Sequence, residues 1–157
     1  MTRFKLLSGA MGVLLALYAT SAPAAQHTTT VPFTAVGQAT LTPSMDGTLN
    51  VSGTGEATHL GHYVVSGTQV FQLGLPPTFV GDITMTAANG DELYITVTGV
   101  LTGFFPNPAG NGQYEITGGT GRFEGASGTG SFDANTERAL YEGSITFAPG
   151  SKGNSES

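Results

Sequence analysis

Residues 116–128 read Ile-Thr-Gly-Gly-Thr-Gly-Arg-Phe-Glu-Gly-Ala-Ser-Gly, a run in which five glycines alternate with apolar and polar positions. The run predicts the end of one strand, a tight glycine turn and the start of the next strand. Gly118, Gly119 and Gly121 suit a sharp reversal, because glycine takes positive φ without steric cost. Gly125 and Gly128 then fall inside a strand-like segment, where glycine is typical of a bend or bulge that lets a sheet curl.

On both sides of this run the chain has the pattern of an all-β protein. Thr, Val, Ile, Phe and Tyr alternate with small polar residues, and turn signals recur at about 8–14 residues. No segment after residue 24 shows a long 3.6-residue apolar period, so no helix is expected. We predict eight strands, at Val31–Leu41, Thr48–His59, Tyr63–Leu73, Phe79–Ala88, Glu92–Thr102, Gly112–Thr117, Arg122–Asp133 and Ala139–Phe147.

The clearest hairpin surrounds Ala88-Asn89-Gly90-Asp91. Asn-Gly is the favoured pair for a type I′ turn, in which both central residues have positive φ. Apolar and polar residues alternate on both sides of the turn, which gives each strand one apolar face. Those faces carry Phe79, Gly81, Ile83, Met85 and Ala87 before the turn, and Leu93, Ile95, Val97, Gly99 and Leu101 after it.

Eight sequential strands joined by short turns predict one eight-stranded antiparallel up-and-down β-barrel, because closure removes unpaired strand edges. A two-sheet β-sandwich is the alternative, since it shows the same alternation. A barrel of this size is either filled by side chains or holds one small ligand. Small residues on the inward face leave both outcomes open; these are Gly53, Gly55, Gly67, Gly81, Gly99 and Gly143.

The segment from Phe104 to Gly112 interrupts the strand pattern, and its two prolines bar strand pairing. It predicts a loop at one mouth of the barrel. Phe104 and Phe105 would either form a lid over a cavity or tuck under their own loop. A second, stiff loop is predicted at Leu75-Pro76-Pro77.

The N-terminal residues 1–24 predict a secretory signal peptide. Two basic residues, Arg3 and Lys5, precede an apolar run from Leu6 to Tyr18, and Ala22-Pro23-Ala24 offers small residues for cleavage. An uncleaved N-terminal anchor is the alternative. We therefore expect a secreted or periplasmic protein.

The rest of the chain predicts a β-barrel domain over residues 25–150 and a disordered tail over 151–157. No cysteine is present, so packing rather than disulfides would stabilise this exported domain. All eleven acidic residues but only three of the five basic ones follow residue 24, which leaves a net charge of −8 there. An acidic surface argues against nucleic acid and anionic lipid as partners. We expect no membrane insertion after signal removal.

The segment Thr117-Gly118-Gly119-Thr120-Gly121-Arg122-Phe123-Glu124-Gly125-Ala126-Ser127-Gly128 resembles the glycine-rich hairpin of the allene oxide cyclase family. It is similar, more loosely, to the matching segment of plant dirigent proteins. The resemblance implies a small calycin-like barrel of eight antiparallel strands, and oligomerisation is common in these families. Cyclases of this family act on an unstable apolar epoxide, with a polarising carboxylate and a bound water, whereas dirigent proteins orient reactive phenolic intermediates. The matched segment is the structural hairpin, so no catalytic residue is transferred to this chain.

His59 and Glu56 are the catalytic candidates. His59 shares the predicted inward parity of its strand, and histidine titrates near neutral pH. A turn at Gly61 could bring His59, His62 and Glu56 together as metal ligands. No further ligand lies at diagnostic spacing, so we predict neither a metal nor a cofactor. The carboxylates beside the glycine run would pair with Arg122 and Arg138 at the surface; they are Glu115, Glu124, Asp133 and Glu137.

Three hypotheses for function follow. The first is a non-catalytic binding module for a small apolar molecule, with ligand contacts from Phe79, Leu93, Ile95, Tyr114, Tyr141, Phe147, Phe104 and Phe105. The second is an isomerase or cyclase, which requires an ionisable group inside the barrel. The third is a structural or interaction protein with a filled core, whose outer patch would comprise Val64, Val70 and Val100. A homo-oligomer is compatible with all three.

Overall fold

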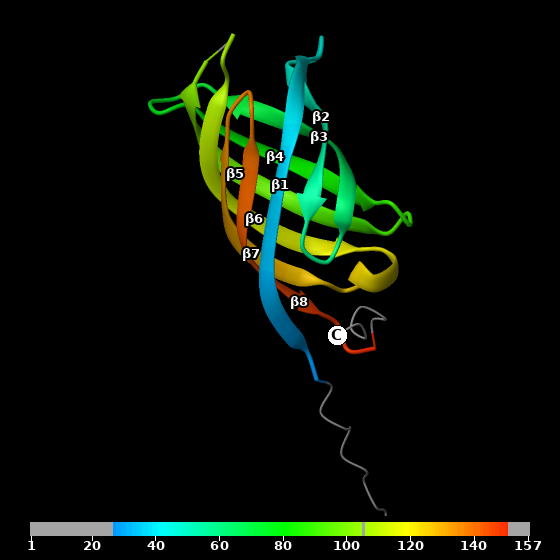
Figure 1. The fold of residues 1–157 in the computed structure, drawn as a ribbon. Helices are drawn as coiled ribbons and strands as arrows, with labels where there is room; N and C mark the ends of the chain where they lie inside the picture. The colour runs from blue at the N-terminus through cyan, green and yellow to red at the C-terminus, as the bar shows by residue number, and fades with distance from the viewer. Residues whose placement is uncertain (1–26, 105, 151–157) are drawn as a thin grey trace, which may run out of the picture.

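The computed structural model describes residues 27–104 and 106–150, which form a closed barrel of eight antiparallel strands (Figure 1). Each strand pairs with its sequence neighbours, and the first strand closes the barrel against the last, from Thr29↔Phe147 to Gly37↔Ala139. The predicted barrel is confirmed and the β-sandwich is excluded. The predicted signal peptide and the tail at 151–157 lie outside the described residues. In the described ranges no helix has the length and hydropathy to cross a membrane.

The strands match the eight predicted segments, with shifts at their ends. They are β1 (Thr29–Pro43), β2 (Thr48–Ala57), β3 (Gly61–Gln72), β4 (Thr78–Ala87), β5 (Glu92–Gly103), β6 (Ala109–Gly119), β7 (Ser127–Ala134) and β8 (Ala139–Phe147). The loop predicted from Phe104 ends early, because β6 begins at Ala109, directly after the second proline. β2 ends at Ala57, two residues before the predicted end at His59.

The connection between β6 and β7 differs from the predicted tight turn. A single 3-10 turn, η1 (Gly121–Phe123), lies between the strands, and β7 begins at Ser127 rather than at Arg122. Gly121 and Gly125 have φ values of 57° and 69° on either side of Phe123. Two glycines in the left-handed region therefore let the chain fold inward and bury Phe123 completely. Burying the Phe123 ring is favourable in free energy, and this gain explains why a longer connection replaces the predicted tight turn.

The hairpin at Asn89-Gly90 is confirmed, but its type I′ turn is wrong. Gly90 has a φ of 88°, whereas Asn89 does not have positive φ. The amide of Gly90 donates to the carbonyl of Ala87 at 2.9 Å. The Asn89 side chain accepts from the amide of Asp91 at 3.1 Å and donates to its carboxylate at 3.0 Å. These local hydrogen bonds favour a turn with a single left-handed residue.

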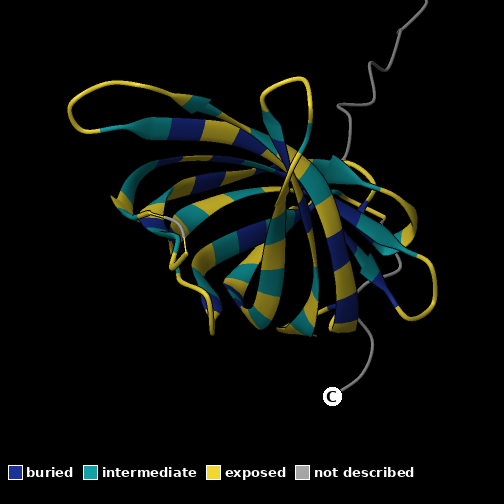
Figure 2. Ribbon diagram, turned by 90° about the horizontal axis from the view of Figure 1, so that it is seen from above, coloured by how far each residue is buried: buried dark blue, intermediate teal, exposed yellow. Residues whose placement is uncertain are grey.

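Buried and exposed residues alternate along the strands, as Figure 2 shows by colour. The inward side chains form one core that includes Phe33, Leu93, Ile95 and Ile145. Two cross-strand glycine pairs, Gly37↔Gly55 and Gly130↔Gly143, make room for inward tyrosines.

A Cβ atom at Gly55 would lie 2.5 Å from the Tyr63 hydroxyl oxygen, and one at Gly130 would lie 2.6 Å from that of Tyr114. Both distances are shorter than a van der Waals contact. The paired glycines therefore accommodate two large rings inside a narrow barrel.

Candidate functional site

The two ends of the barrel have different connections. The β2–β3, β4–β5 and β6–β7 connections gather at one end, here called the closed end, toward the lower right of Figure 1. The loops at residues 44–47, 73–77, 104–108 and 135–138 gather at the opposite end, here called the open end, toward the top of that view.

Apolar side chains plug the closed end. Phe123 from η1 is fully buried, and its ring stacks on that of Phe147 at a centroid distance of 6.1 Å. Leu60 of the β2–β3 turn is 5% exposed. These side chains come from two connections and one strand, and together they close the barrel at this end.

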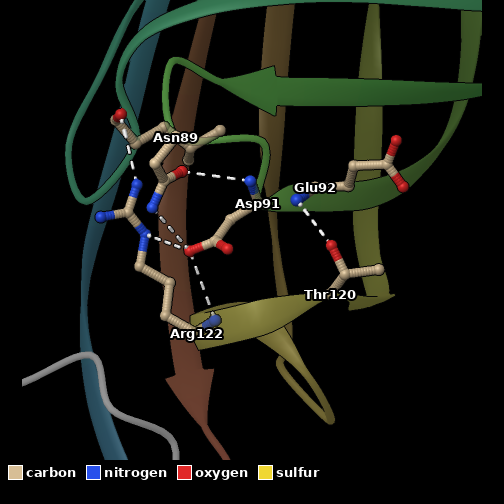
Figure 3. Close-up of polar contacts among 6 residues, drawn as sticks. Asn89, Asp91, Glu92, Thr120 and Arg122 are labelled. Atoms are coloured by element: carbon tan, nitrogen blue, oxygen red, sulfur yellow. Dashed lines mark hydrogen bonds and ion pairs between the residues drawn. The ribbon is translucent and has the colours of Figure 1, made fainter.

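Polar contacts tie the plug to the neighbouring turns (Figure 3). Arg122 Nε lies 3.5 Å from Asp91 Oδ2, and Arg122 Nη2 donates to the carbonyl of Leu60 at 3.4 Å. The guanidinium also lies 4.9 Å from the centre of the Phe123 ring. Glu92 donates its amide to Thr120 Oγ1 at 3.0 Å. Arg122 thus links η1 to both the β4–β5 and the β2–β3 turns.

A hollow of about 730 Å³ lies on the outer surface beside this plug, between Asp91, Arg122, Glu124 and Pro149. Its one basic group already interacts with Asp91, and Glu124 adds negative charge. The hollow therefore does not favour an anion, and its walls, which contain charged groups and no large apolar side chain, do not suit an apolar molecule.

The open end contains a cavity of about 270 Å³ that extends into the barrel. Its apolar walls include Phe71, Phe79, Phe132, Leu101 and Tyr141. Polar residues also border it; they are Thr40, Gln69, Asn135 and Thr136. A mainly apolar hollow with aromatic rings in its wall and polar groups at its border is the usual composition of a small-molecule site.

Aromatic rings form a chain from this cavity to the middle of the barrel. Phe71 packs edge-on against Phe79 at 6.0 Å, and Phe79 against Phe132 at 5.8 Å. Phe132 stacks on Tyr141 at 5.7 Å, and Tyr141 packs edge-on against Tyr114 at 5.7 Å. Because each ring is held by its neighbours, the cavity walls are preformed.

Tyrosine hydroxyls are the titratable groups of the interior. Burial raises the pKa of Tyr63 to about 12, with the Glu56 carboxylate contributing, and burial raises the pKa of Tyr114 to about 12. The pKa of Tyr141 is raised by burial and then by neighbouring Tyr63. All three hydroxyls are therefore protonated near neutral pH. Tyr114 is 2% exposed, and its hydroxyl has no hydrogen-bond partner among the described residues.

The predicted ligand-contact residues occupy different places. Phe79 and Tyr141 line the cavity. Leu93, Ile95, Tyr114 and Phe147 face inward as predicted, but they pack in the core away from the cavity.

Phe104 and Phe105 are predicted either to form a lid over the cavity or to tuck under their own loop. Phe104 is 66% exposed on the rim and does not line the cavity, so neither expectation holds for it. Phe105 lies outside the described residues.

Sequence reasoning missed Phe71, Phe132, Gln69 and Asn135 as cavity residues. Parity already placed Phe71 on the same face as Tyr63, and Phe132 on the same face as Gly130. The missing information was which end of each strand reaches the open end. Up-and-down order supplies it, because strands β1, β3, β5 and β7 all run toward the open end.

The predicted inward position of His59 is wrong. His59 lies in the β2–β3 turn with a φ of 67°, and it is exposed because β2 has already ended. Its Nε2 lies 3.1 Å from the carbonyl oxygen of Pro32, and its ring packs edge-on against Phe147. This contact places the ring at the closed end, far from the cavity residues of the opposite loops.

Glu56 and His62 pair across β2 and β3 on the outer face, with His62 Nδ1 3.1 Å from Glu56 Oε1. Their side chains are 72% and 61% exposed, and His59 does not join them. Over residues 27–104 and 106–150, no group of three or more His, Asp or Glu side chains is placed to hold a metal ion. In the same ranges no charged side chain is buried.

Comparison of the sequence with protein-family models and with curated proteins gives no match. The resemblance of residues 117–128 to the allene oxide cyclase hairpin stays a prediction. The barrel itself is shown by the structure, and it does not by itself specify an activity.

Proposed function

We propose that this protein is an exported binding module that holds a small apolar molecule in the open-end cavity without converting it. The observation that carries the proposal is the cavity itself, about 270 Å³ in volume and lined by Phe71, Phe79, Phe132 and Tyr141. An apolar cavity of ~150 Å³ is enough to bind benzene. The barrel therefore has room for a molecule of about two fused rings.

The lining also indicates the chemistry of the ligand. Its aromatic walls favour a flat or branched hydrocarbon body, since burying such a surface gives most of the binding energy. Gln69 and Asn135 at the border offer amide groups to a single polar substituent. Near neutral pH the Tyr141 hydroxyl is protonated, so it is suited to donate to an acceptor oxygen.

The isomerase alternative requires an ionisable acid or base inside the barrel. In the described ranges the interior has protonated tyrosines but no buried carboxylate, histidine, lysine or arginine. A tyrosine with a raised pKa is a poor base at neutral pH. This arrangement supports binding over catalysis.

The structural alternative rests on an outer patch of valines. Val64 and Val70 are 53% and 46% exposed, but Val64 pairs with Thr54 and Thr86, whereas Val70 pairs with Val80. The β4 partner of Val100 is Thr78, near the open end, whereas the β4 partner of Val64 is Thr86, near the opposite end of that strand. The three predicted valines do not form one patch, which favours the binding hypothesis.

The test fills the cavity. Ala39→Phe and Ala134→Phe each place a ring in the lining, and Thr42→Phe places one on the exposed outer side of β1 as a matched control. The fluorescence of 2-naphthol, a two-ring probe with one hydroxyl, reports binding to each purified protein.

We expect the wild type and Thr42→Phe to bind the probe, and each filled variant to lose at least ~10-fold in affinity, about 1.4 kcal/mol. Native mass spectra of wild-type protein purified without added ligand would show whether a natural small molecule copurifies. Probe affinity that is equal in all four proteins, or absent from the wild type, would contradict the proposal.

A further inference from the structure

The exposed apolar side chains of this protein are concentrated at the open end. Met45, Leu73 and Leu75 are 98% exposed or more, and Phe104 is 66% exposed. The other large exposed hydrophobic residues in the described ranges are 36–53% exposed and lie on strands. A single exposed apolar side chain is normal, but several that gather at one end of a molecule often mark a contact surface.

These four side chains come from three successive loops around the mouth. Met45 belongs to the β1–β2 loop, Leu73 and Leu75 to the β3–β4 loop, and Phe104 to the β5–β6 loop. The amide of Leu101 donates to the carbonyl of Pro77 at 2.9 Å, so the second loop is tied to β5, the strand that leads into the third loop. We call these four residues the apolar arc.

Charge is distributed in the opposite way. The loop residues 73–77 and 104–108 contain no charged residue, and the β1–β2 loop contributes only Asp46. Glu137 and Arg138 lie together on the β7–β8 loop, across the mouth from residues 73–77. At the closed end, by contrast, Asp91, Glu92, Arg122 and Glu124 lie beside the plug.

We infer that the apolar arc docks the open end onto the surface of a neutral, zwitterionic phospholipid bilayer. Protruding Leu and Phe side chains on the two uncharged loops, and Met45 beside Asp46, can enter the boundary between headgroups and acyl chains. The open-end loops contain a single basic residue, Arg138, which is too few to attract anionic lipid. The contact is at the surface and does not require any strand to span the bilayer.

A bilayer fits this rim better than a rigid protein does. The apolar arc is a row of separate protruding side chains beside a cavity. A second protein could bury them only with a surface of complementary shape, whereas lipid adapts to their shape. The cavity opens within the same ring of loops. Docking would therefore place the opening of the cavity against the bilayer, where apolar molecules dissolve. The idea that a ligand passes between the bilayer and the cavity rests on the proposed function, whereas the docking itself does not.

The test compares two triple variants in flotation with phosphatidylcholine vesicles. Leu73→Gln, Leu75→Gln and Phe104→Gln together remove most of the apolar arc. Val64→Thr, Val70→Thr and Val80→Thr together remove three exposed apolar side chains from the outer wall as the matched control. Both sets keep the net charge, and threonine suits strands nearly as well as valine does.

We expect wild type and the wall variant to float with the vesicles, and the arc variant to lose at least ~10-fold in partitioning, because bilayer binding scales with buried apolar area. Added phosphatidylglycerol should not strengthen binding, and added salt should not weaken it. Absence of wild-type flotation, or equal loss in both variants, would overturn the inference.

Two further readouts separate the alternatives. Light scattering that shows wild-type dimers and an arc variant that is monomeric would assign the arc to a second copy and overturn the inference. Binding of 2-naphthol in solution should be the same in the arc variant as in wild type. Lost flotation with retained 2-naphthol binding would thus separate docking from the cavity.

Discussion

The closed and the open ends of this barrel begin from the same hairpin topology, yet one is sealed and the other is hollow. At the closed end η1 turns Phe123 inward, and Arg122 ties it to two neighbouring turns. At the open end the loops carry prolines and protruding apolar side chains, and a cavity of about 270 Å³ remains.

The difference shows that closing the sheet does not close the barrel. An up-and-down barrel always has two mouths, and each needs a side chain from a connection to fill it. In this chain the β6–β7 connection supplies such a side chain at one mouth. At the other mouth, Phe104 of the β5–β6 loop is exposed instead.

The largest expected effect comes from removing the plug. Phe123→Ala should lower the free energy of unfolding by ~3–5 kcal/mol, because a fully buried ring leaves a cavity behind it. Phe71→Ala at the open end should cost only ~1–2 kcal/mol, since Phe71 is half-buried and already borders empty space. Urea denaturation of both variants measures the difference. Equal losses would show that the two ends are packed alike.

The tyrosines between the two ends should set the alkaline limit of stability. A folded-state pKa of about 12 for Tyr63 and Tyr114 means that the folded state holds protons which the unfolded state, with a pKa near 10, releases. The two buried tyrosines contribute fully to the free energy of unfolding below pH ~10. As the pH rises toward 12, this contribution falls by ~2–3 kcal/mol for each residue.

Urea denaturation at neutral and alkaline pH tests this. Tyr63→Phe and Tyr114→Phe should each reduce the alkaline loss. Tyr94→Phe should reduce it less, because Tyr94 lies on the exposed outer face, where mainly a hydrogen bond to Glu92 raises its pKa. At neutral pH Tyr114→Phe should be neutral or stabilising, because the removed hydroxyl is buried and makes no hydrogen bond within residues 27–104 and 106–150. An unchanged alkaline profile in both interior variants would refute the assignment.

The smallest effect should come from the polar tie at the closed end. Asp91→Asn weakens the contact with Arg122, and we expect a loss of ~0.5–1 kcal/mol, since both side chains are partly exposed and water screens them. Glu56→Gln weakens an exposed contact with His62 and should have almost no effect. Amide exchange at η1 should accelerate in Asp91→Asn alone. Similar exchange in both variants would mean that the tie does not hold the plug.

Much of the fold was predictable, because the two-residue period assigns faces locally. Phe79, Ile95 and Tyr141 face inward as their parity indicates. The candidate site was only partly predictable. The alternation shows which face of the sheet a side chain is on, but not how far along the barrel axis it lies. Leu93, Ile95 and Phe79 are therefore predicted as one group of ligand contacts, although only Phe79 of the three lines the cavity.

His59 shows a second limit. The prediction that His59 faces inward requires β2 to continue to residue 59. In the structure β2 ends at Ala57, and His59 lies in the turn with a positive φ, so its ring is outside the barrel. Strand ends depend on which neighbouring amides find partners, and that pairing is set by the assembled sheet rather than by the local pattern.

The sequence by itself determined the strands, their inward faces and their order, because alternation and turn residues act over a few neighbouring positions. The tertiary structure decided that Phe123 seals one mouth and that Phe71, Phe79 and Phe132 surround a hollow at the other. Those outcomes depend on which side chains from distant strands meet inside the closed barrel, and that is a property of volume and depth rather than of local pattern.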